Sequence, residues 1–341
     1  MEVLSLFDGI SCARVALERA GIPIKSYTAY EIDKRAIEIS KKNYPSIIHK
    51  GDVKQLQNPI KVDLLIGGSP CTDLSRANNN GKGLEGERSK LFWEYVRILK
   101  LCKPTYFILE NVASMKPDDK EIITRELGVN PIMIDAGLVS AQIRRRYFWT
   151  NITTAVPDNR NITLRSILEP VINPILPLST DLYTVSIGNE TTAKVREATK
   201  QGFVIAKEYQ TIDLSFPKSK TRRGRVGDKV KTLMTTLSIG VLLKEGIRML
   251  TTIECERLQS LPDNYTSGTS DRQRIKCLGN AFNVEVVAHI LRGLLKYRLS
   301  RDDWESQYGS YYTKHLPHRS LDDLYNEYLS LIHISEPTRP Y

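Results

Sequence analysis

The stretch VLSLFDGISCARVALERA, residues 3–20, carries the pattern that decides the fold. Residues 3–7 are an apolar run typical of a buried strand, and residues 12–20 follow with the spacing of a helix. Strands alternating with helices predict βαβ units, and hence an α/β fold with a mostly parallel sheet covered on both faces. The same pattern predicts strands at 27–31, 62–66, 106–109, 131–135 and 146–150, and helices at 34–43 and 88–101.

The alternation weakens from about residue 152 to 244, where prolines interrupt short strand-like runs at 182–187 and 203–206. This pattern indicates a smaller, irregular second domain. Helical periodicity returns at 252–258 and 284–295, so we expect the chain to re-enter and complete the first domain. The expected divisions are 1–170, 171–245, 246–299 and a tail at 300–341, whose last twelve residues, 330–341, resemble a translated sequencing adaptor and are expected to be non-native.

The charge is unevenly distributed along the 341 residues, which have a formal net charge of +10. Between residues 194 and 231, eleven Lys or Arg face four acids, a net charge of +7. Such a segment suits a surface that binds phosphates, although a solvated flexible linker has the same composition.

The five cysteines are odd in number and form no CxxC pair, which argues against a disulfide framework and against a zinc site, so we expect no metal. An apolar run of the ~20 residues that a membrane helix needs is absent, as is a signal-peptide pattern, so we expect an intracellular protein without membrane association.

Three acidic or glycine-containing strand ends suggest a nucleotide-like ligand. The loop FDGIS at 7–11 has one glycine, Gly9, whereas a dinucleotide fingerprint has three. Glu31 ends the next strand, where a carboxylate can accept hydrogen bonds from both ribose hydroxyls. Asp52 follows in GDV, placed to accept from an adenine amino group. Together they predict an adenosine-containing ligand without phosphates, which S-adenosylmethionine fits better than NAD or ATP.

The segment IGGSPCTDLS, residues 66–75, delivers one cysteine, Cys71, onto a loop after a strand. A lone cysteine is usually structural, but Pro-Cys at a strand end of a ligand-binding sheet favours a nucleophile, whose reactive form is the thiolate. The next strand ends in Glu110, where a carboxyl can act as a general acid or form a salt bridge across strand ends. Because side chains alternate along a strand, Arg144 and Arg146 are expected on the same face. There they could orient the Glu110 carboxylate, although an arginine run can also form a solvated edge of a sheet.

Nine segments in this order resemble the cytosine-5 DNA methyltransferases, from residue 3 to about 291 with a gap over the middle domain. They are FDGIS, YEID, GDV, GGSPCTDLS, ERSKLFWEYVRIL, ENV, QIRRRYFW, LTTIECERLQSLPDNYT and IKCLGNAFNVEVVAHIL. GGSPCTDLS and YFW are most similar to the animal de novo enzymes and to some phage members. The resemblance implies a Rossmann-like S-adenosylmethionine-dependent fold with a target-recognition domain at 171–245. It also implies a cofactor site made by Phe7, Asp8, Gly9, Ile10, Glu31, Ile32, Asp52, Val53, Pro70, Leu91, Asn280 and Ala281.

The mechanism that the resemblance implies is attack of Cys71 on C6 of a cytosine, while Glu110 protonates or hydrogen-bonds N3. Carbon 5 then takes the methyl group, and loss of its proton releases the cysteine. Arg144 and Arg146 would hold Glu110 and the base, with Arg144 as the main catalytic partner. The base must be flipped out of the duplex, and Ser75 with the loop at 78–83 would close over it.

The expected partner is double-stranded DNA. The segment at 163–170 resembles the one that follows the catalytic half of bacterial members, and the basic excess lies in the expected recognition domain. We expect a monomer that acts beside a separate cognate restriction endonuclease, cytoplasmic and nucleoid-associated in a bacterium or phage, or nuclear in a eukaryote. The same basic cluster also fits a nuclear-import signal. Its candidate phosphate or guanine contacts are Lys218, Lys220, Arg222, Arg223 and Arg225.

Three other readings compete with DNA methylation. A tRNA cytosine-5 methyltransferase on the same scaffold would carry a Cys-Phe-Thr tripeptide, which this sequence lacks, and other RNA enzymes use Thr-Cys where Cys71 follows Pro70. An inactive regulatory paralogue usually loses the nucleophile or the carboxylate, whereas Cys71, Glu110 and Arg144 are all present. An NAD-dependent oxidoreductase is disfavoured by the single-glycine loop.

Overall fold

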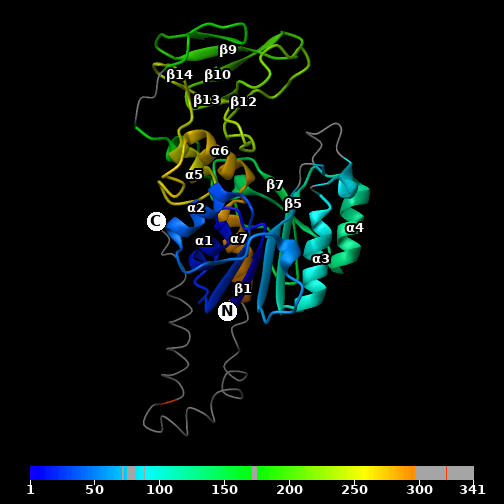
Figure 1. The fold of residues 1–341 in the computed structure, drawn as a ribbon. Helices are drawn as coiled ribbons and strands as arrows, with labels where there is room; N and C mark the ends of the chain where they lie inside the picture. The colour runs from blue at the N-terminus through cyan, green and yellow to red at the C-terminus, as the bar shows by residue number, and fades with distance from the viewer. Residues whose placement is uncertain (71–72, 75–81, 88, 171–174, 296–319, 321–341) are drawn as a thin grey trace.

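The computed structural model describes residues 1–70, 73–74, 82–87, 89–170, 175–295 and 320 (Figure 1). Its main feature is a seven-stranded sheet in the order β3-β2-β1-β4-β5-β7-β6. Every pairing is parallel except those of β7, which runs antiparallel to β5 and to β6. The mostly parallel sheet expected from the sequence is therefore confirmed. Its strands are β1 (Glu2–Leu6), β2 (Ser26–Tyr30), β3 (Ile48–His49), β4 (Leu64–Gly68), β5 (Tyr106–Val112), β6 (Ile132–Asp135) and β7 (Arg145–Thr150).

Alternating side chains along the strands fill two separate cores, one on each face of the sheet. In β4, Leu64 and Ile66 belong to one core and Leu65 to the other. Helices α1, α2 and α7 cover the first face, and α3 and α4 cover the second; α5 and α6 contribute to the first core from the end of the sheet nearest the small domain (Figure 1). Their bounds are α1 Cys12–Arg19, α2 Lys34–Asn43, α3 Leu91–Cys102, α4 Pro117–Leu127, α5 Thr252–Leu258, α6 Asp271–Asn280 and α7 Val284–Leu291.

The strand order creates a topological switch point between β1 and β4. From β1 the chain moves outward through β2 to β3, and then returns to β4 on the other side of β1. In such sheets ligands bind outside the carboxyl ends of the strands at this point, because the connecting loops diverge there. The loop after β1 and the loop after β4 therefore border the expected cofactor site from its two sides.

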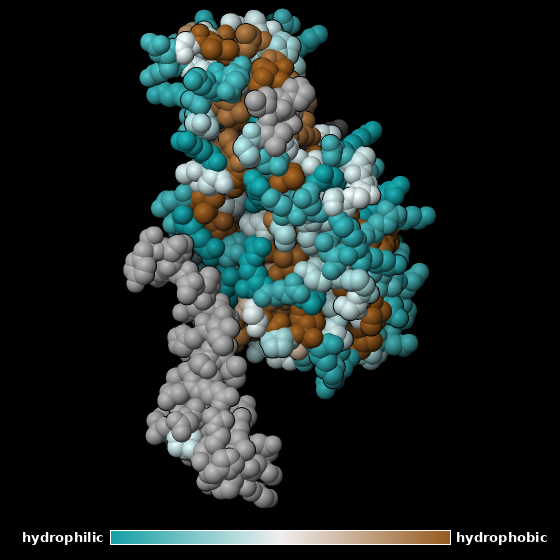
Figure 2. Space-filling model, turned by 90° about the vertical axis from the view of Figure 1, so that its left-hand side faces the viewer, coloured by the Kyte–Doolittle hydropathy of each residue, from teal (hydrophilic) through white to brown (hydrophobic). Residues whose placement is uncertain are grey.

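The smaller domain is built from two antiparallel sheets at one end of the molecule, above α5 and α6 in Figure 1. It has its own core, formed by residues such as Leu182, Val195 and Ile247. Figure 2 shows apolar side chains gathered at the surface of this domain among hydrophilic ones. Its strands are β8 (Tyr183–Ser186), β9 (Thr192–Arg196), β10 (Phe203–Lys207), β11 (Thr211–Asp213), β12 (Val226–Gly227), β13 (Ile239–Leu243) and β14 (Gly246–Met249).

A fully buried ion pair fastens the return from the small domain. Arg248 of β14 and Glu254 of α5 are both 0% exposed, and Nη2 of Arg248 lies 2.6 Å from Oε1 of Glu254. Glu254 also completes a capping box with Thr251 and accepts a hydrogen bond from the backbone N–H of Glu169. One carboxylate thus holds the start of α5, the end of β14 and the entry to the small domain.

Replacing Glu254 with alanine is expected to lower the free energy of unfolding by about 3–5 kcal/mol, because Arg248 would stay buried without its counter-charge. Asp263→Ala is the matched control, since Asp263 pairs with Arg257 at the surface and such pairs contribute only about 0–1 kcal/mol. Urea unfolding followed by circular dichroism measures both. Equal midpoints for the two variants would contradict the structural role assigned to Glu254.

Candidate active site

The loop after β1 is shaped by three residues in the left-handed region: Phe7 at φ 56°, Gly9 at 60° and Ser11 at 62°. Parallel pairing sets Leu6 opposite Tyr30, which brings this loop beside Glu31. The backbone N–H of Gly9 donates to Oε2 of Glu31 over 2.8 Å. A Cβ placed on Gly9 would have no heavy atom within 4 Å, so the space above the loop is open.

The donors and acceptors around that space fit an adenosine-containing cofactor. A carboxylate has about four lone-pair sites. The carboxylate of Glu31 accepts hydrogen bonds from the backbone N–H groups of Gly9, Ile32 and Asp33, which leaves one lone-pair site for a hydroxyl. Ile32 is 70% exposed beside it, an apolar surface on which a flat ring could pack. Asp52 is half-buried and accepts from the backbone N–H of Lys54, so its second oxygen remains available to an amino group.

Three side chains expected at the cofactor lie in the interior instead. Asp8 is buried, its carboxylate accepts from Ser11 and from the Tyr27 hydroxyl, and burial raises its pKa. Ile10 and Val53 are core residues. The side chains of Asp8, Ile10 and Val53 therefore support the wall of the site from behind, and a cofactor could reach only their backbone. The sequence pattern does not show whether a side chain in such a loop faces the cofactor site or the core, because the turns of the loop set its direction.

The loop after β4 carries the expected nucleophile, but Cys71 and Ser75 lie outside the described residues, as do residues 78–81 of the expected lid. What precedes Cys71 is described. The exit of β4 is held by Asn111, which is fully buried and donates through Nδ2 to the carbonyl and the hydroxyl of Ser69. The carbonyl of Pro70 accepts from the Ser89 hydroxyl just before α3, whose first residue, Leu91, is half-buried. Asn111 was missed as a site residue, although it stands next to Glu110 in the ENV segment.

Glu110 lies against the start of the nucleophile loop. The register of β4 and β5 pairs Gly68 with Glu110, and a Cβ on Gly68 would lie 3.1 Å from Oε2 of the carboxylate. A side chain at this position would crowd the carboxylate, which would have to shift by a few tenths of an ångström. Oε1 lies 2.8 Å from Nε of Arg146, and both side chains are 13% exposed. The Glu110 carboxylate, paired with the Arg146 guanidinium, thus lies beside Gly68, which precedes Cys71 by three residues.

Arg144 and Arg146 make different contacts. Arg146 forms the ion pair with Glu110, whereas Arg144 is 4% exposed and donates to backbone carbonyls. Its acceptors are the carbonyls of Leu233 at 3.4 Å, Gly279 at 3.2 Å and Ala281 at 2.6 Å. Of the two arginines expected to hold Glu110, Arg146 thus forms the ion pair with it, whereas the catalytic role expected of Arg144 stays a prediction. The contacts differ because Arg144 precedes β7, where the chain meets two segments far away in sequence.

Two buried glutamines complete the junction around Arg144. Gln142 accepts from the backbone N–H of Leu233 and donates to the carbonyl of Leu258. Gln259 donates to the carbonyls of Leu278 and Ala281. The junction joins the arginine segment, the connection leading from β12 to β13, and the end of α6, where Asn280 is exposed. Neither glutamine was predicted as a site residue. The only indication in the sequence was that each lies within a segment that resembles the cytosine-5 DNA methyltransferases.

Replacing Arg144 with methionine is expected to weaken cofactor binding as well as the fold. The carbonyls of Leu233, Gly279 and Ala281 would lose a charged donor, and each buried unsatisfied group costs about 1–3 kcal/mol. Isothermal titration with S-adenosylmethionine and urea unfolding measure the two effects. Arg145→Met is the matched control, because Arg145 is 68% exposed and pairs only at the surface with Asp135. A variant with wild-type cofactor affinity would refute the role of the junction in placing residues 280–281.

The basic residues of the small domain differ in exposure. Lys218, Lys220 and Arg223 are exposed. Arg222 is partly exposed and lies 2.5 Å from Oδ2 of Asp213. Arg225 is 1% exposed and donates to the carbonyls of Asp213, Ser215 and Phe216. The prediction that Arg225 contacts DNA is therefore wrong, because its guanidinium is enclosed by its own loop.

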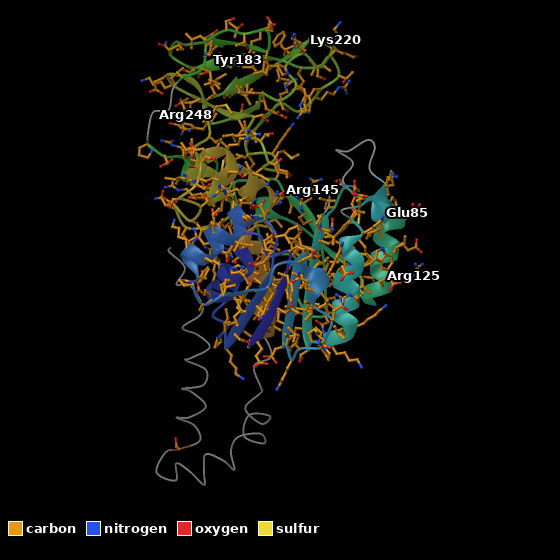
Figure 3. All side chains as sticks on the ribbon, viewed as in Figure 1. Glu85, Arg125, Arg145, Tyr183, Lys220 and Arg248 are labelled. Carbon is orange, nitrogen blue, oxygen red and sulfur yellow. The ribbon has the colours of Figure 1, made fainter. Side chains whose placement is uncertain are left out.

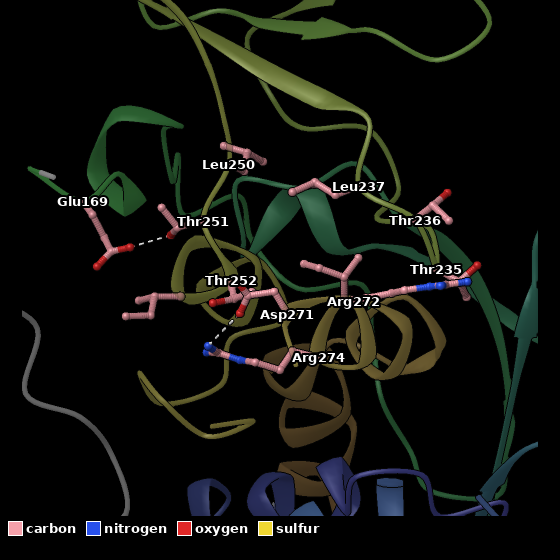
Figure 4. Close-up of a pocket in the computed structure, with 12 residues that line it drawn as sticks. Glu169, Thr235, Thr236, Leu237, Leu250, Thr251, Thr252, Asp271, Arg272 and Arg274 are labelled. Atoms are coloured by element: carbon pink, nitrogen blue, oxygen red, sulfur yellow. Dashed lines mark hydrogen bonds and ion pairs between the residues drawn. The ribbon is translucent and has the colours of Figure 1, made fainter. Parts of the chain in front are cut away.

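A pocket of about 670 Å³ lies between α5, α6 and the connections to the small domain (Figure 4). Its lining includes Thr235, Thr236, Thr251 and Arg272. It contains none of the residues predicted to bind the cofactor or to take part in catalysis, so the pocket and the chemistry occupy different places. Within the described ranges, no helix is long and apolar enough to span a membrane, and no cluster of His, Cys, Asp and Glu could hold a metal ion.

The family described as C-5 cytosine-specific DNA methylase matches residues 1–129 and 142–296. The chain belongs to this family. The methylase is 28% identical to the type II methyltransferase M.FnuDI of Fusobacterium nucleatum, over 88% of this chain and 95% of that protein. It is 25% identical to the type II methyltransferase M.NgoPII of Neisseria gonorrhoeae, over 87% and 96%. The solved structure of the Entamoeba histolytica methyltransferase EhMeth has the same fold, with a TM-score of 0.60, 18% identity and coverage of 86% of this chain and 97% of its own. The methylase is thus an enzyme of the cytosine-5 DNA methyltransferase type, as the sequence predicted.

Proposed function

We propose that this enzyme transfers a methyl group from S-adenosylmethionine to carbon 5 of a cytosine flipped out of double-stranded DNA, through a covalent bond to Cys71. The observation that carries the proposal is the Glu110–Arg146 ion pair, which lies over Gly68 at the exit of β4. The carboxyl group that the reaction requires is thus held beside the loop that delivers the only cysteine in a Pro-Cys sequence.

The other cysteines support this assignment of the nucleophile. Burial raises the pKa of the thiols of Cys12 and Cys255, and it raises that of Cys277 to about 11. Thiolate, the nucleophilic form, is therefore disfavoured at all three positions. Cys102 ends α3 and precedes β5, so it lies at the amino end of the strands, opposite the edge that carries Glu110.

In the proposed reaction the sulfur of Cys71 bonds to C6 of the cytosine, and the displaced electron pair makes C5 nucleophilic while negative charge develops at N3. Glu110 stabilises that charge by donating a proton or hydrogen bond to N3, and Arg146 fixes the orientation of its carboxyl group. Bound S-adenosylmethionine supplies an electrophilic methyl group on a sulfonium sulfur. A base then takes the proton from C5, the electron pair of that C–H bond re-forms the C5–C6 double bond, and the C6–S bond breaks to release Cys71 as a thiolate.

The cofactor assignment rests on the donor set beside Gly9. Glu31 would accept from the ribose, Asp52 from the adenine amino group, and Ile32 would pack on the ring. The backbone of the loop starting at Phe7, together with Pro70, Leu91, Asn280 and Ala281, would complete the site. The similarity to type II methyltransferases supports a separate cognate restriction endonuclease. In this proposal the enzyme acts as a monomer, residues 171–245 would recognise the target sequence, and Ser75 with residues 78–83 would close over the flipped base.

The test is bisulfite sequencing of plasmid DNA from methylation-free cells that express the chain, with an empty vector as control. Cytosine methylation at a recurring short motif is the expected result. Unmodified DNA together with methylated host tRNA would instead assign the same chemistry to an RNA substrate. A folded protein that modifies neither nucleic acid would refute the proposal.

A further inference from the structure

The loop between β11 and β12, residues 214–225, has an unusual composition. Its sequence, LSFPKSKTRRGR, contains five cations and no acid. We call this segment the basic loop. Figure 3 shows Lys220 at the edge of the small domain, projecting away from its sheets. The position of the loop between two short strands makes it an excursion from the small domain rather than part of its core.

Arg225 holds the basic loop in one shape from the inside. Its guanidinium is enclosed and binds the backbone carbonyls of Asp213, Ser215 and Phe216 at 2.8–2.9 Å. At the other side of the loop, the carboxylate of Glu197 accepts from the backbone N–H groups of Gly224 and Arg225 at 2.6 and 2.9 Å. The carbonyls of Ser215 and Phe216 therefore face Arg225, and the side chains that follow, from Phe216 to Lys218, are exposed.

Phe216 is the side chain that this arrangement exposes most. It is 71% exposed, the highest value among the large apolar side chains in the part of the chain that the structure describes. Its φ of 49° lies in the left-handed region, which is unfavourable for an aromatic residue. Arg222 lies over the ring, 5.4 Å from its centroid, and Asp213 holds Arg222 in place by an ion pair. A partner that covered the free face of the ring would remove this apolar surface from water and so gain binding energy.

The surroundings of Phe216 specify the chemistry of that partner. Lys218, Lys220 and Arg223 follow Phe216 in the basic loop and are exposed, and five cations without an acid in the loop favour an anionic partner surface. Duplex DNA combines a line of phosphates with apolar base edges, such as the thymine methyl group, that an aromatic ring can contact. The basic loop matches both features, because it has cations that can bind the phosphates and one apolar ring that can contact the bases.

We propose that Phe216 is a specificity-determining residue that contacts base edges of the DNA duplex, while Lys218 and Lys220 neutralise phosphates. The inference deepens the proposed function and rests on it. Arg222 and Arg225 act indirectly: Arg222 holds the ring at one face, and Arg225 holds the loop. This division of roles within one cationic cluster follows from burial and hydrogen bonding, which the sequence pattern does not contain.

The test compares Phe216→Ala with Lys218→Ala/Lys220→Ala, and uses Ile205→Ala as the matched control, since Ile205 is a 50% exposed apolar residue on β10 of the same domain. Fluorescence anisotropy over a series of salt concentrations measures binding to two duplexes, one with the motif mapped by bisulfite sequencing and one with that motif scrambled. Phe216→Ala is expected to weaken binding to the motif roughly 5- to 100-fold, with the scrambled duplex and the salt slope unchanged. The double lysine variant is expected to weaken both duplexes and to reduce the slope of log K against log salt by about 1.8.

Several outcomes would overturn the inference. One is an unchanged preference for the motif in Phe216→Ala, or a preference reduced as much in Ile205→Ala. Another is a wild-type dimer in sedimentation that Phe216→Ala dissociates, because the ring would then be covered by a second copy of the chain. If either result is found while the wild type still methylates its motif, the role of Phe216 is refuted but the proposed function stands. A wild type that methylates no DNA removes the proposed function as well.

Discussion

Replacing Cys71 with alanine is expected to abolish methyl transfer, with a loss on the order of 10⁴-fold or more, because no remaining group can form the bond to C6. Affinity for S-adenosylmethionine is expected to stay within about twofold, since Pro70 is the only proposed cofactor residue on the loop of Cys71 and the others lie on other segments. Transfer of a labelled methyl group to plasmid DNA measures the first quantity, and calorimetric titration measures the second. Cys102→Ala is the matched control, as Cys102 is partly exposed but lies at the opposite edge of the sheet.

A duplex that carries 5-fluorocytosine in the methylated motif tests the covalent step directly. Fluorine at C5 replaces the proton whose loss releases the enzyme, so the C6–S bond formed by Cys71 persists. The wild type and Cys102→Ala are expected to form an adduct that survives denaturing electrophoresis, and Cys71→Ala is expected to form none. An adduct in Cys71→Ala would assign the nucleophile to another residue and would refute the proposed mechanism.

Replacing Glu110 with glutamine is expected to slow methyl transfer by about 10²- to 10⁴-fold, the usual contribution of a general acid. Glutamine preserves the size of the side chain over Gly68 but carries no negative charge for Arg146 and cannot transfer a proton to N3. The loss should appear in kcat rather than in KM for DNA, because the interaction strengthens as charge develops at N3. Single-turnover kinetics with the labelled cofactor measures it.

The arginines beside Glu110 supply the controls for that experiment. Arg146→Ala is expected to lower kcat as well, since Glu110 would lose the guanidinium 2.8 Å away that orients it. Arg145→Ala should leave kcat unchanged, because Arg145 points to the surface and pairs with Asp135. If Arg145→Ala and Arg146→Ala have the same effect, the ion pair with Glu110 plays no part in catalysis.

Periodicity in the sequence predicted the catalytic sheet well and the remainder less well. The expected strands and helices of the first 150 residues all occur, with boundaries shifted by a few residues, because strands buried on both faces form continuous apolar runs. Helices α4 and α6 were missed: their segments, PDDKEIITREL and DRQRIKCLGN, are strongly polar and bury only a few side chains. In the small domain the expected β8 and β10 occur, whereas β9 and the short strands β11 to β14 were not anticipated.

The candidate site divides in the same way. Glu31 directly follows β2, Asp52 lies three residues after β3, and Glu110 lies near the end of β5, because parallel strands bring their carboxyl ends to one edge. Asp8, Ile10 and Val53 were placed at the cofactor, but their side chains face the interior. The expected domain boundaries, the catalytic role of Cys71 and the cofactor contacts remain predictions.

The alternation of strands and helices along the chain, the expected position of the site at the carboxyl ends of the strands and the family could all be predicted from the sequence, because each depends on local spacing and on motifs in a given order. The partner of each arginine became visible only in the folded structure. Arg146 meets Glu110 across β5 and β7, Arg144 binds the carbonyls of Leu233, Gly279 and Ala281, and Arg225 is enclosed by its own loop. The physical reason is that a guanidinium is equally suited to a carboxylate, a carbonyl or a phosphate, so its role is set by the distant segments that folding brings within hydrogen-bonding distance.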